Sequence, residues 1–146
     1  MTRESQEHLQ YTLATHAVEH LTPSDEALRL CRQVSEGALK AEEAVAERRE
    51  QYDFATSRAV ARLNILLELT APYVKVGGAV LAMKGAAGRE ELAECKNAIR
   101  QLGLKLEQVH EFPMDGTNHM VIVLRKVSPT PAKYPRRYAK IKASPL

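Results

Sequence analysis

The stretch REQYDFATSRAVARLN, residues 49–64, reads as a strand that ends on small polar residues and continues directly into a helix. Tyr52–Thr56 has the apolar and aromatic character that favours a strand. Ser57 and Arg58 lie where this strand is expected to end, and a helical pattern begins at Ala59. Ligands bind at the carboxyl ends of strands in open α/β sheets. The stretch therefore predicts that Ser57 and Arg58 face a ligand site.

The alternation of strand and helix continues beyond this stretch. We expect a helix over residues 59–75, a turn at Gly77-Gly78, a buried apolar strand over 79–83, a helix over 89–102, and strands over 104–112 and 120–124. Strand–helix alternation implies a parallel sheet with helices on its faces. The turn Asp115-Gly116-Thr117 joins the last two strands into an antiparallel hairpin. The predicted fold class is α/β, a partial Rossmann-like sheet with a terminal antiparallel hairpin.

The two ends of the chain differ from this central region. Residues 1–21 and a stretch from Thr22 to about residue 50 have helical patterns, and Gly37 is expected to interrupt the second helix. Prolines exclude regular structure over much of the tail that ends the chain. The sequence thus predicts a helical segment over 1–50, an α/β region over 51–127 and a basic, proline-rich tail over 128–146.

Composition bounds the class of protein. The chain has 146 residues, enough for one domain with a modest core. It has no apolar run near the ~18 residues that a membrane span needs, and residues 1–10 lack the apolar region of a secretory signal. Cys31 and Cys95 lie far apart and are interpreted as buried thiols in a reducing compartment. We expect a cytoplasmic protein without a membrane partner. A monomer is expected, and an incomplete sheet edge offers a route to an oligomer.

Charge is distributed unevenly along the chain. The net charge is −4 over residues 1–50, zero over 51–124 and +7 over 125–146, which contains no acidic residue. A basic tail favours polyanions, and nucleic acid above all. Tyr134 and Tyr138 lie among the tail's cations, where aromatic rings can stack on bases. The alternative is that Tyr134 packs on the sheet and the cations alone face the nucleic acid.

One short motif suggests a metal. The stretch HAVEH, residues 16–20, fits the pattern of inverted zinc peptidases, and His16 and His20 are one helical turn apart. No third ligand is evident, so we interpret the stretch as a solvated helix face and predict neither a metal site nor a catalytic side chain.

Five blocks of the sequence together resemble one family. They are REQYDFATSRAVARLNILLE, GGAVLAMKG, REELAECKNAIRQLG, the strand pair that ends in HMVIVLRKV, and TPAKYPRR with the final SPL. In this order they resemble the C-terminal half of the bacterial small-subunit ribosomal RNA methyltransferase G family, also called glucose-inhibited division protein B. The resemblance covers about residues 40–146 and implies an S-adenosylmethionine-dependent methyltransferase sheet.

The resemblance implies a reaction and cofactor contacts. The family transfers a methyl group from S-adenosylmethionine to N7 of a guanine in 16S ribosomal RNA. Its Arg-Ala-Glu-Glu block matches KAEE, residues 40–43, so Ala41 and Glu42 are the implied cofactor contacts, with Lys40 in place of the usual arginine. The arginine of the strand-end motif, also a cofactor contact in the family, is Arg58 here.

The resemblance also implies contacts to the small-subunit RNA. Lys84 belongs to the LKG-like block beside the site, and from its position we expect it to contact RNA or cofactor. The tail keeps the family's TPxKYPRR pattern and stays basic beyond it. The expected RNA-binding residues are therefore Lys84, Lys133, Tyr134, Arg136, Arg137, Lys140 and Lys142.

The chain departs from the family in its first third. The family carries a Gly-rich loop after its first strand, where glycine lets the backbone approach the cofactor closely. Before Tyr52 this sequence holds one glycine, Gly37, and no convincing first strand. The sequence is thus interpreted as a truncated or divergent methyltransferase without the Gly-rich loop. The alternatives are a non-catalytic remnant that binds RNA or the ribosome, and an orphan fragment without a stable function.

Overall fold

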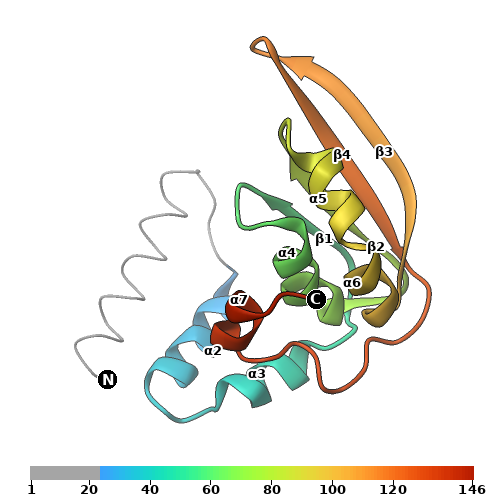
Figure 1. The fold of residues 1–146 in the computed structure, drawn as a ribbon. Coiled ribbons are helices and arrows are strands. Elements are labelled where there is room, and N and C mark those ends of the chain that lie inside the picture. The colour runs from blue at the N-terminus through green and yellow to red at the C-terminus, as the bar shows by residue number, and fades with distance from the viewer. Residues whose placement is uncertain (1–23) are drawn as a thin grey trace. The chain divides into compact units, whose positions relative to one another are not determined.

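A computed structural model describes residues 24–146 of the chain, which divides into two units, Met1–Arg48 and Arg49–Leu146. The predicted helix over 1–21 and the HAVEH motif lie outside the described residues. Among the residues described, no helix is long and apolar enough to span a bilayer. The elements, labelled in Figure 1, are α2 (Asp25–Ser35), α3 (Ala41–Arg48), β1 (Tyr52–Arg58), α4 (Leu63–Thr70), η1 (Ala71–Tyr73), β2 (Val74–Lys84), α5 (Gly88–Glu94), α6 (Lys96–Gln101), β3 (Leu104–Met114), β4 (Thr117–Lys126) and α7 (Tyr138–Ala143).

Two short helices make up the described part of the first unit. The predicted interruption at Gly37 is confirmed, because α2 ends at Ser35 and α3 begins at Ala41. Gly37 has a φ of 72°, a left-handed conformation that glycine adopts without steric cost. At the start of α3, the backbone N–H of Lys40 donates to Oε2 of Glu43 at 3.0 Å, which satisfies one donor that the helix start leaves unpaired.

The second unit contains a four-stranded mixed sheet in the order β1-β2-β4-β3. β1 and β2 are parallel, and β4 is antiparallel to both β2 and β3. Figure 1 shows β3 and β4 as a long hairpin. The predicted α/β class with a terminal antiparallel hairpin is confirmed, and β1 ends at Arg58 as expected.

Helices α4, α5 and α6 form one core with the sheet. Alternation along β2 buries Val80 and Ala82 completely, whereas Leu81 is half-buried and Met83 is 43% exposed. Buried residues from the helices and from β4 complete this core: Leu63, Leu66, Leu67, Cys95, Ala98, Leu102, Met120, Ile122 and Leu124. The apolar side chains of the sheet therefore divide into one buried face and one exposed face.

The predicted turn at Gly77-Gly78 is wrong, because both glycines lie inside β2. The register of β1 with β2 shifts between Tyr52 and Phe54, so residues 75–78 bulge from the pairing. A Cβ on Gly78 would lie 2.4 Å from the backbone oxygen of Asp53. Glycine here allows β1 to approach closely, which the sequence alone does not distinguish from a turn.

Both predicted long helices are shorter than expected. The helix expected over 59–75 starts at Leu63, ends at Thr70 and continues as the one-turn 3₁₀ helix η1, which contains Pro72. The helix expected over 89–102 is two helices, α5 and α6, separated at Cys95. The tail contains the short helix α7, between proline-containing segments.

A buried ion pair ties the tail to α4. Glu68 is fully buried and accepts four hydrogen bonds from Arg136, one from its backbone N–H and three from its guanidinium, at 2.6–3.2 Å. This pairing raises the pKa of the Arg136 guanidinium. A buried carboxylate is costly without a partner, so Glu68 and Arg136 depend on each other.

We predict that Glu68→Ala destabilises the second unit by about 3–5 kcal/mol, because it leaves the enclosed guanidinium of Arg136 unpaired. Urea unfolding followed by far-UV circular dichroism measures this change. Glu107→Ala is the matched control, because Glu107 pairs with Arg125 on the surface, where such pairs contribute about 1 kcal/mol or less. Equal losses in the two variants would contradict the structural role of the buried pair.

Candidate functional site

The carboxyl ends of the two parallel strands form the first candidate region. Arg58 ends β1 beside Met83 of β2, and Arg58 is exposed. The Oγ of Ser57 is buried without a hydrogen-bond partner, and a buried hydroxyl normally has one. Ala59 follows with a φ of 53°, an unfavourable conformation for a residue with a Cβ. Strained backbone and an unsatisfied polar group are features of binding sites.

A nearly buried ion pair holds the loop that follows β1. The Nζ of Lys84 lies 2.8 Å from Oε2 of Glu91 and donates to the backbone oxygen of Ala61. Glu91 also accepts the backbone N–H of Leu63 at 2.7 Å, at the start of α4. Lys84 thus positions the loop beside Arg58, and its side chain is 11% exposed. A contact of Lys84 to RNA or cofactor stays a prediction.

The thiol nearest this region has no reactive character. Cys95 is buried in the core, as predicted, and burial together with Glu91 and Glu94 raises its pKa to about 12. A thiol with so high a pKa stays protonated at neutral pH and is a poor nucleophile. The side chain of Cys31 lies outside the described residues.

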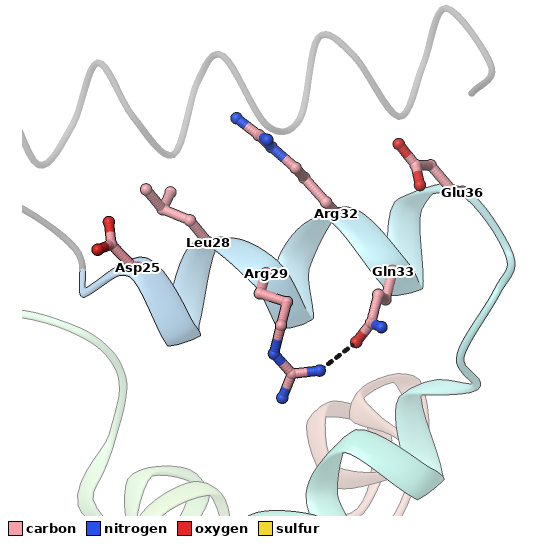
Figure 2. A pocket seen from close by; sticks show the side chains of 6 residues that line it. All are labelled: Asp25, Leu28, Arg29, Arg32, Gln33 and Glu36. Carbon is pink, nitrogen blue, oxygen red and sulfur yellow. Dashed lines mark hydrogen bonds between the residues drawn. The ribbon is translucent and has the colours of Figure 1, made fainter.

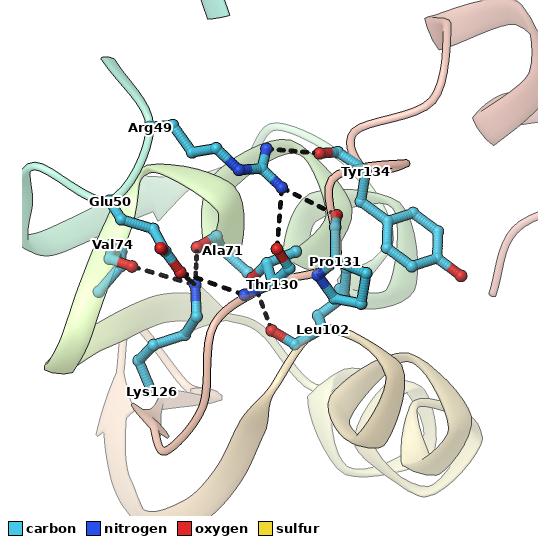
Figure 3. A network of polar contacts seen from close by, with 9 residues as sticks. All are labelled: Arg49, Glu50, Ala71, Val74, Leu102, Lys126, Thr130, Pro131 and Tyr134. Carbon is cyan, nitrogen blue, oxygen red and sulfur yellow. Dashed lines mark hydrogen bonds and ion pairs between the residues drawn. The ribbon is translucent and has the colours of Figure 1, made fainter. Parts of the chain in front are cut away.

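Arg49 anchors the start of the basic tail, as Figure 3 shows. Its guanidinium donates to the backbone oxygens of Thr130, Pro131 and Tyr134 at 2.7–2.9 Å. Three charge-assisted hydrogen bonds from one side chain fix the path of the backbone over residues 130–134.

A buried lysine completes this network (Figure 3). Lys126 is 1% exposed and donates to the backbone oxygens of Ala71 and Val74 at 2.7 and 3.0 Å. Its Nζ lies 3.3 Å from Oε1 of Glu50, which also accepts the backbone N–H of Thr130. Burial lowers the pKa of Lys126, although Glu50 opposes this effect. The network joins the residues before β1 to the tail.

The tail residues divide into packed and exposed groups. Tyr134 is 3% exposed and belongs to the core, which agrees with the packing alternative and not with stacking on a base. Arg136 is engaged with Glu68, as described above. The other predicted contacts, Lys133, Arg137, Lys140 and Lys142, are exposed. The structure therefore presents four cations on a segment whose backbone is anchored.

The two regions lie at opposite ends of the parallel strands. Arg49 and Glu50 precede β1 and bind residues 130–134, whereas Arg58 ends β1. A seven-residue strand spans roughly 23 Å at about 3.3 Å per residue. This length separates Arg58 from residues 130–134, where the tail begins.

The remaining predicted cofactor contacts belong to the first unit. Ala41 and Glu42 lie in the first turn of α3, and Glu42 is exposed. Figure 2 shows a pocket in this unit whose described lining lies on α2 and at Glu36 just after it, and includes the hydrogen bond from Arg29 to Gln33 at 2.8 Å. The described lining residues carry charges of both signs and do not by themselves indicate a ligand.

Sequence reasoning missed the residues that hold the tail, namely Arg49, Glu50, Glu68 and Lys126. A signal existed for Glu68, which is the one charged residue in the apolar helix LNILLELT. Lys126 similarly ends β4 and follows Met120, Ile122 and Leu124 at the alternate, buried positions of that strand. A charged residue on a predicted core face indicates a buried pair, because charges are rarely fully buried without a partner.

The fold and this site define a class of protein. A mixed α/β sheet with a candidate ligand region at the carboxyl ends of its parallel strands is consistent with a Rossmann-like methyltransferase fold. The chain matches the model of the rRNA small subunit methyltransferase G family over residues 20–121. It belongs to that family.

Curated relatives named "Ribosomal RNA small subunit methyltransferase G" agree with this assignment. The chain is 49% identical to the relative from Fervidobacterium nodosum over 88 residues, which cover 60% of the chain and 41% of the relative. It is 49% identical to the relative from Caldanaerobacter subterraneus over 67% of the chain and 41% of the relative. The relative from Thermotoga neapolitana is 46% identical over 67% of the chain and 43% of its own length. The chain thus spans less than half the length of the curated relatives it matches.

We predict that Arg49→Met releases the tail backbone without unfolding the sheet, because it removes three hydrogen bonds to residues 130–134. Amide hydrogen exchange read by mass spectrometry should show at least tenfold faster exchange over 128–136, with β2 and β4 unchanged.

Arg62→Met is the matched control, because Arg62 forms an exposed pair with Glu94 away from the tail. Unchanged exchange over 128–136 in Arg49→Met would show that Arg49 does not anchor the tail.

Proposed function

We propose that this chain acts as a 16S ribosomal RNA (guanine-N7) methyltransferase that uses S-adenosylmethionine. It would do so as a family member without the Gly-rich loop. The observation that carries the proposal is the exposed Arg58 at the carboxyl end of β1. The unpartnered Oγ of Ser57 lies one residue earlier, on the core side of the strand. The carboxyl end of a parallel strand is where α/β sheets bind ligands. A ribosomal RNA substrate places the proposed reaction in the cytoplasm.

The residues at the carboxyl ends of β1 and β2 fit part of a cofactor site. The guanidinium of Arg58 offers several donors in a fixed geometry suited to a carboxylate, and the methionine part of S-adenosylmethionine carries one. Ala41 and Glu42 are proposed as further contacts through the family resemblance. Lys84 and Glu91 would keep the loop after Arg58 in place, since they fix Ala61 and Leu63.

The reaction needs no catalytic side chain from this edge. S-Adenosylmethionine supplies an activated methyl group, and N7 of guanine carries an unprotonated lone pair at neutral pH. No general base is required, so the protein contributes mainly orientation and exclusion of water. A reaction of this kind agrees with the structure, because the carboxyl end of β1 presents binding groups and the buried thiol of Cys95 is inert.

The exposed tail cations are proposed to bind the RNA. Lys133, Arg137, Lys140 and Lys142 are exposed on the anchored segment and helix α7. Cations neutralise phosphates whatever the base sequence, so such contacts position the RNA and do not select the guanine. Tyr134 and Arg136 support this surface from beneath, since both are held in the fold.

We predict that Arg58→Ala weakens S-adenosylmethionine binding at least tenfold, because it removes the exposed cation at the carboxyl edge. Isothermal titration calorimetry on the full chain measures the affinity, and a methylation assay on small-subunit RNA follows if heat is detected.

Arg100→Ala removes an exposed arginine from α6 and is the matched control, expected to bind as the unmodified chain does. No heat with a folded, unmodified chain, or equal affinity in Arg58→Ala, would refute the proposed cofactor site.

A second candidate function is RNA or ribosome binding without catalysis. The anchoring of the basic tail by Arg49 and Glu68 favours it, because this surface is complete without a Gly-rich loop. This second function requires only the tail. If it is correct, the chain binds RNA even though it does not bind the cofactor.

We predict that Lys140→Gln and Lys142→Gln together reduce the slope of log affinity against log salt by about 2, since each phosphate contact contributes about 1. Fluorescence anisotropy with a small-subunit RNA fragment at several salt concentrations gives the slope. Lys96→Gln with Lys105→Gln removes two exposed lysines outside the tail and serves as the control. An equal reduction in both double variants would mean that binding follows net charge and not the tail surface.

A further inference from the structure

The end of the β3–β4 hairpin projects beyond the rest of the described sheet. Lys84 ends β2 and pairs with Met120 of β4, so the hairpin between Phe112 and His119 has no third strand beside it among the described residues. This part of the hairpin extends about 10 Å past Lys84, at about 3.4 Å per residue, and its turn is at the top of Figure 1. The projection leaves the sheet at the carboxyl end of β2, the end at which Arg58 lies.

Three side chains form a small surface on this projection. The rings of Phe112 and His119 stack, with their centroids 6.1 Å apart and an angle of 22° between their planes. Phe112 is 40% exposed and Met114 is 47% exposed, and alternation along β3 puts both on one face. We call this surface the ring platform and define it by Phe112, Met114 and His119. None of the three belongs to the core formed by the described residues, so packing does not account for them.

The ring platform lies on the same face of the sheet as Arg58. Residues in register on adjacent strands point to the same face. The register joins four residues in one row across the sheet, namely Arg58, Met83, Val121 and His110. Phe112 lies two residues beyond His110 and therefore shares this face. Strand spacings of about 4.8 Å and a rise of about 3.4 Å per residue place Phe112 roughly 16 Å from Arg58, a distance that one RNA strand can span.

The size and charge of the ring platform suit a nucleobase. Unpaired RNA bases stack on aromatic side chains, whereas a stable protein interface needs roughly 800 Å² on each partner, far more than three side chains on two strands offer. Glu111 lies on the other face of β3 and pairs with Arg89. Asp115, exposed in the turn, repels phosphates. The contact that this surface favours is therefore to a base and not to the RNA backbone.

We propose that the ring platform stacks on an unpaired base that flanks the target guanine of the small-subunit RNA. This inference rests on the proposed function, from which it takes the RNA substrate. The tail cations bind phosphates whatever the base, whereas the ring platform holds one base at a fixed place relative to Arg58. Phe112 is thus a positioning residue that brings the target guanine to the carboxyl end of β1.

Phe112→Leu tests the proposal, because leucine keeps the apolar bulk but offers no ring to a base. Fluorescence anisotropy measures the affinity of the full chain for a small-subunit RNA fragment with unpaired bases beside the target guanine. The variant should bind at least fivefold more weakly. Its salt dependence should not change, because no phosphate contact is lost. Phe112→Tyr should bind as the unmodified chain does. Phe54→Leu is the matched control, because Phe54 is 61% exposed but lies on β1, away from the projection.

A fluorescent base analogue locates the contact. Aminopurine, whose fluorescence falls when it stacks on a ring, replaces each unpaired flanking base in turn. The unmodified chain should quench it at one position, and Phe112→Leu should not. Circular dichroism checks that the variants fold. Unchanged affinity in Phe112→Leu, or an equal loss in Phe54→Leu, would overturn the proposal. So would an effect of Phe112→Leu seen only with whole small subunits, which would indicate a ribosomal protein as the partner.

These measurements separate the ring platform from the proposed methyl transfer. No cofactor is present, so a chain that does not methylate RNA confirms the ring platform if Phe112→Leu weakens RNA binding as expected. Conversely, if the double variant of Lys140 and Lys142 weakens RNA binding and Phe112→Leu does not, the ring platform alone is refuted.

Discussion

The parallel pairing of β1 with β2 is the constraint on which the rest of the second unit depends. Parallel neighbours need a crossover, and α4 with η1 provides it. The crossover buries Leu63, Leu66 and Leu67 against the sheet and carries Glu68 into the interior. The same pairing aligns the end of β1 with the end of β2, so Arg58 lies beside Met83. One strand register thus determines the core, the anchor of the tail and the position of the candidate cofactor contact.

The candidate cofactor region and the anchor of the tail lie at different places along this sheet. The carboxyl end of β1 presents Arg58 and the loop that Lys84 and Glu91 hold, whereas Arg49, before β1, and Glu68, on α4, fix the tail. An RNA that contacts residues 130–134 must therefore extend roughly 23 Å, the length of β1, to place a base near Arg58. A structured ribosomal RNA is large enough to do so, which makes the separation compatible with one substrate.

The sequence predicted element types well where the hydrophobic pattern was strong, as in β2, β4 and the end of β1 at Arg58. It placed a turn at Gly77-Gly78, because glycine needed for the close approach of Asp53 looks identical to glycine in a turn. The candidate site was predictable in part. Arg58 follows from its place at the end of a strand and from the family resemblance. The burial of Tyr134 depends on tertiary contacts, and so does the pairing of Arg136 with Glu68, 68 positions earlier. The single charge in the apolar helix α4 signals that Glu68 needs a partner, but the local sequence does not identify Arg136 as that partner.

We propose that the candidate cofactor site at the carboxyl end of β1 and the candidate RNA-binding tail are separate surfaces of the second unit. Amide chemical-shift mapping by NMR, with S-adenosylhomocysteine added to the isotopically labelled full chain, tests it most directly. We expect shifts at residues 57–61 and 84–86, with the amides of 130–142 unchanged. Shifts centred on 130–142, or no shift at 57–61 at saturating ligand, would contradict it.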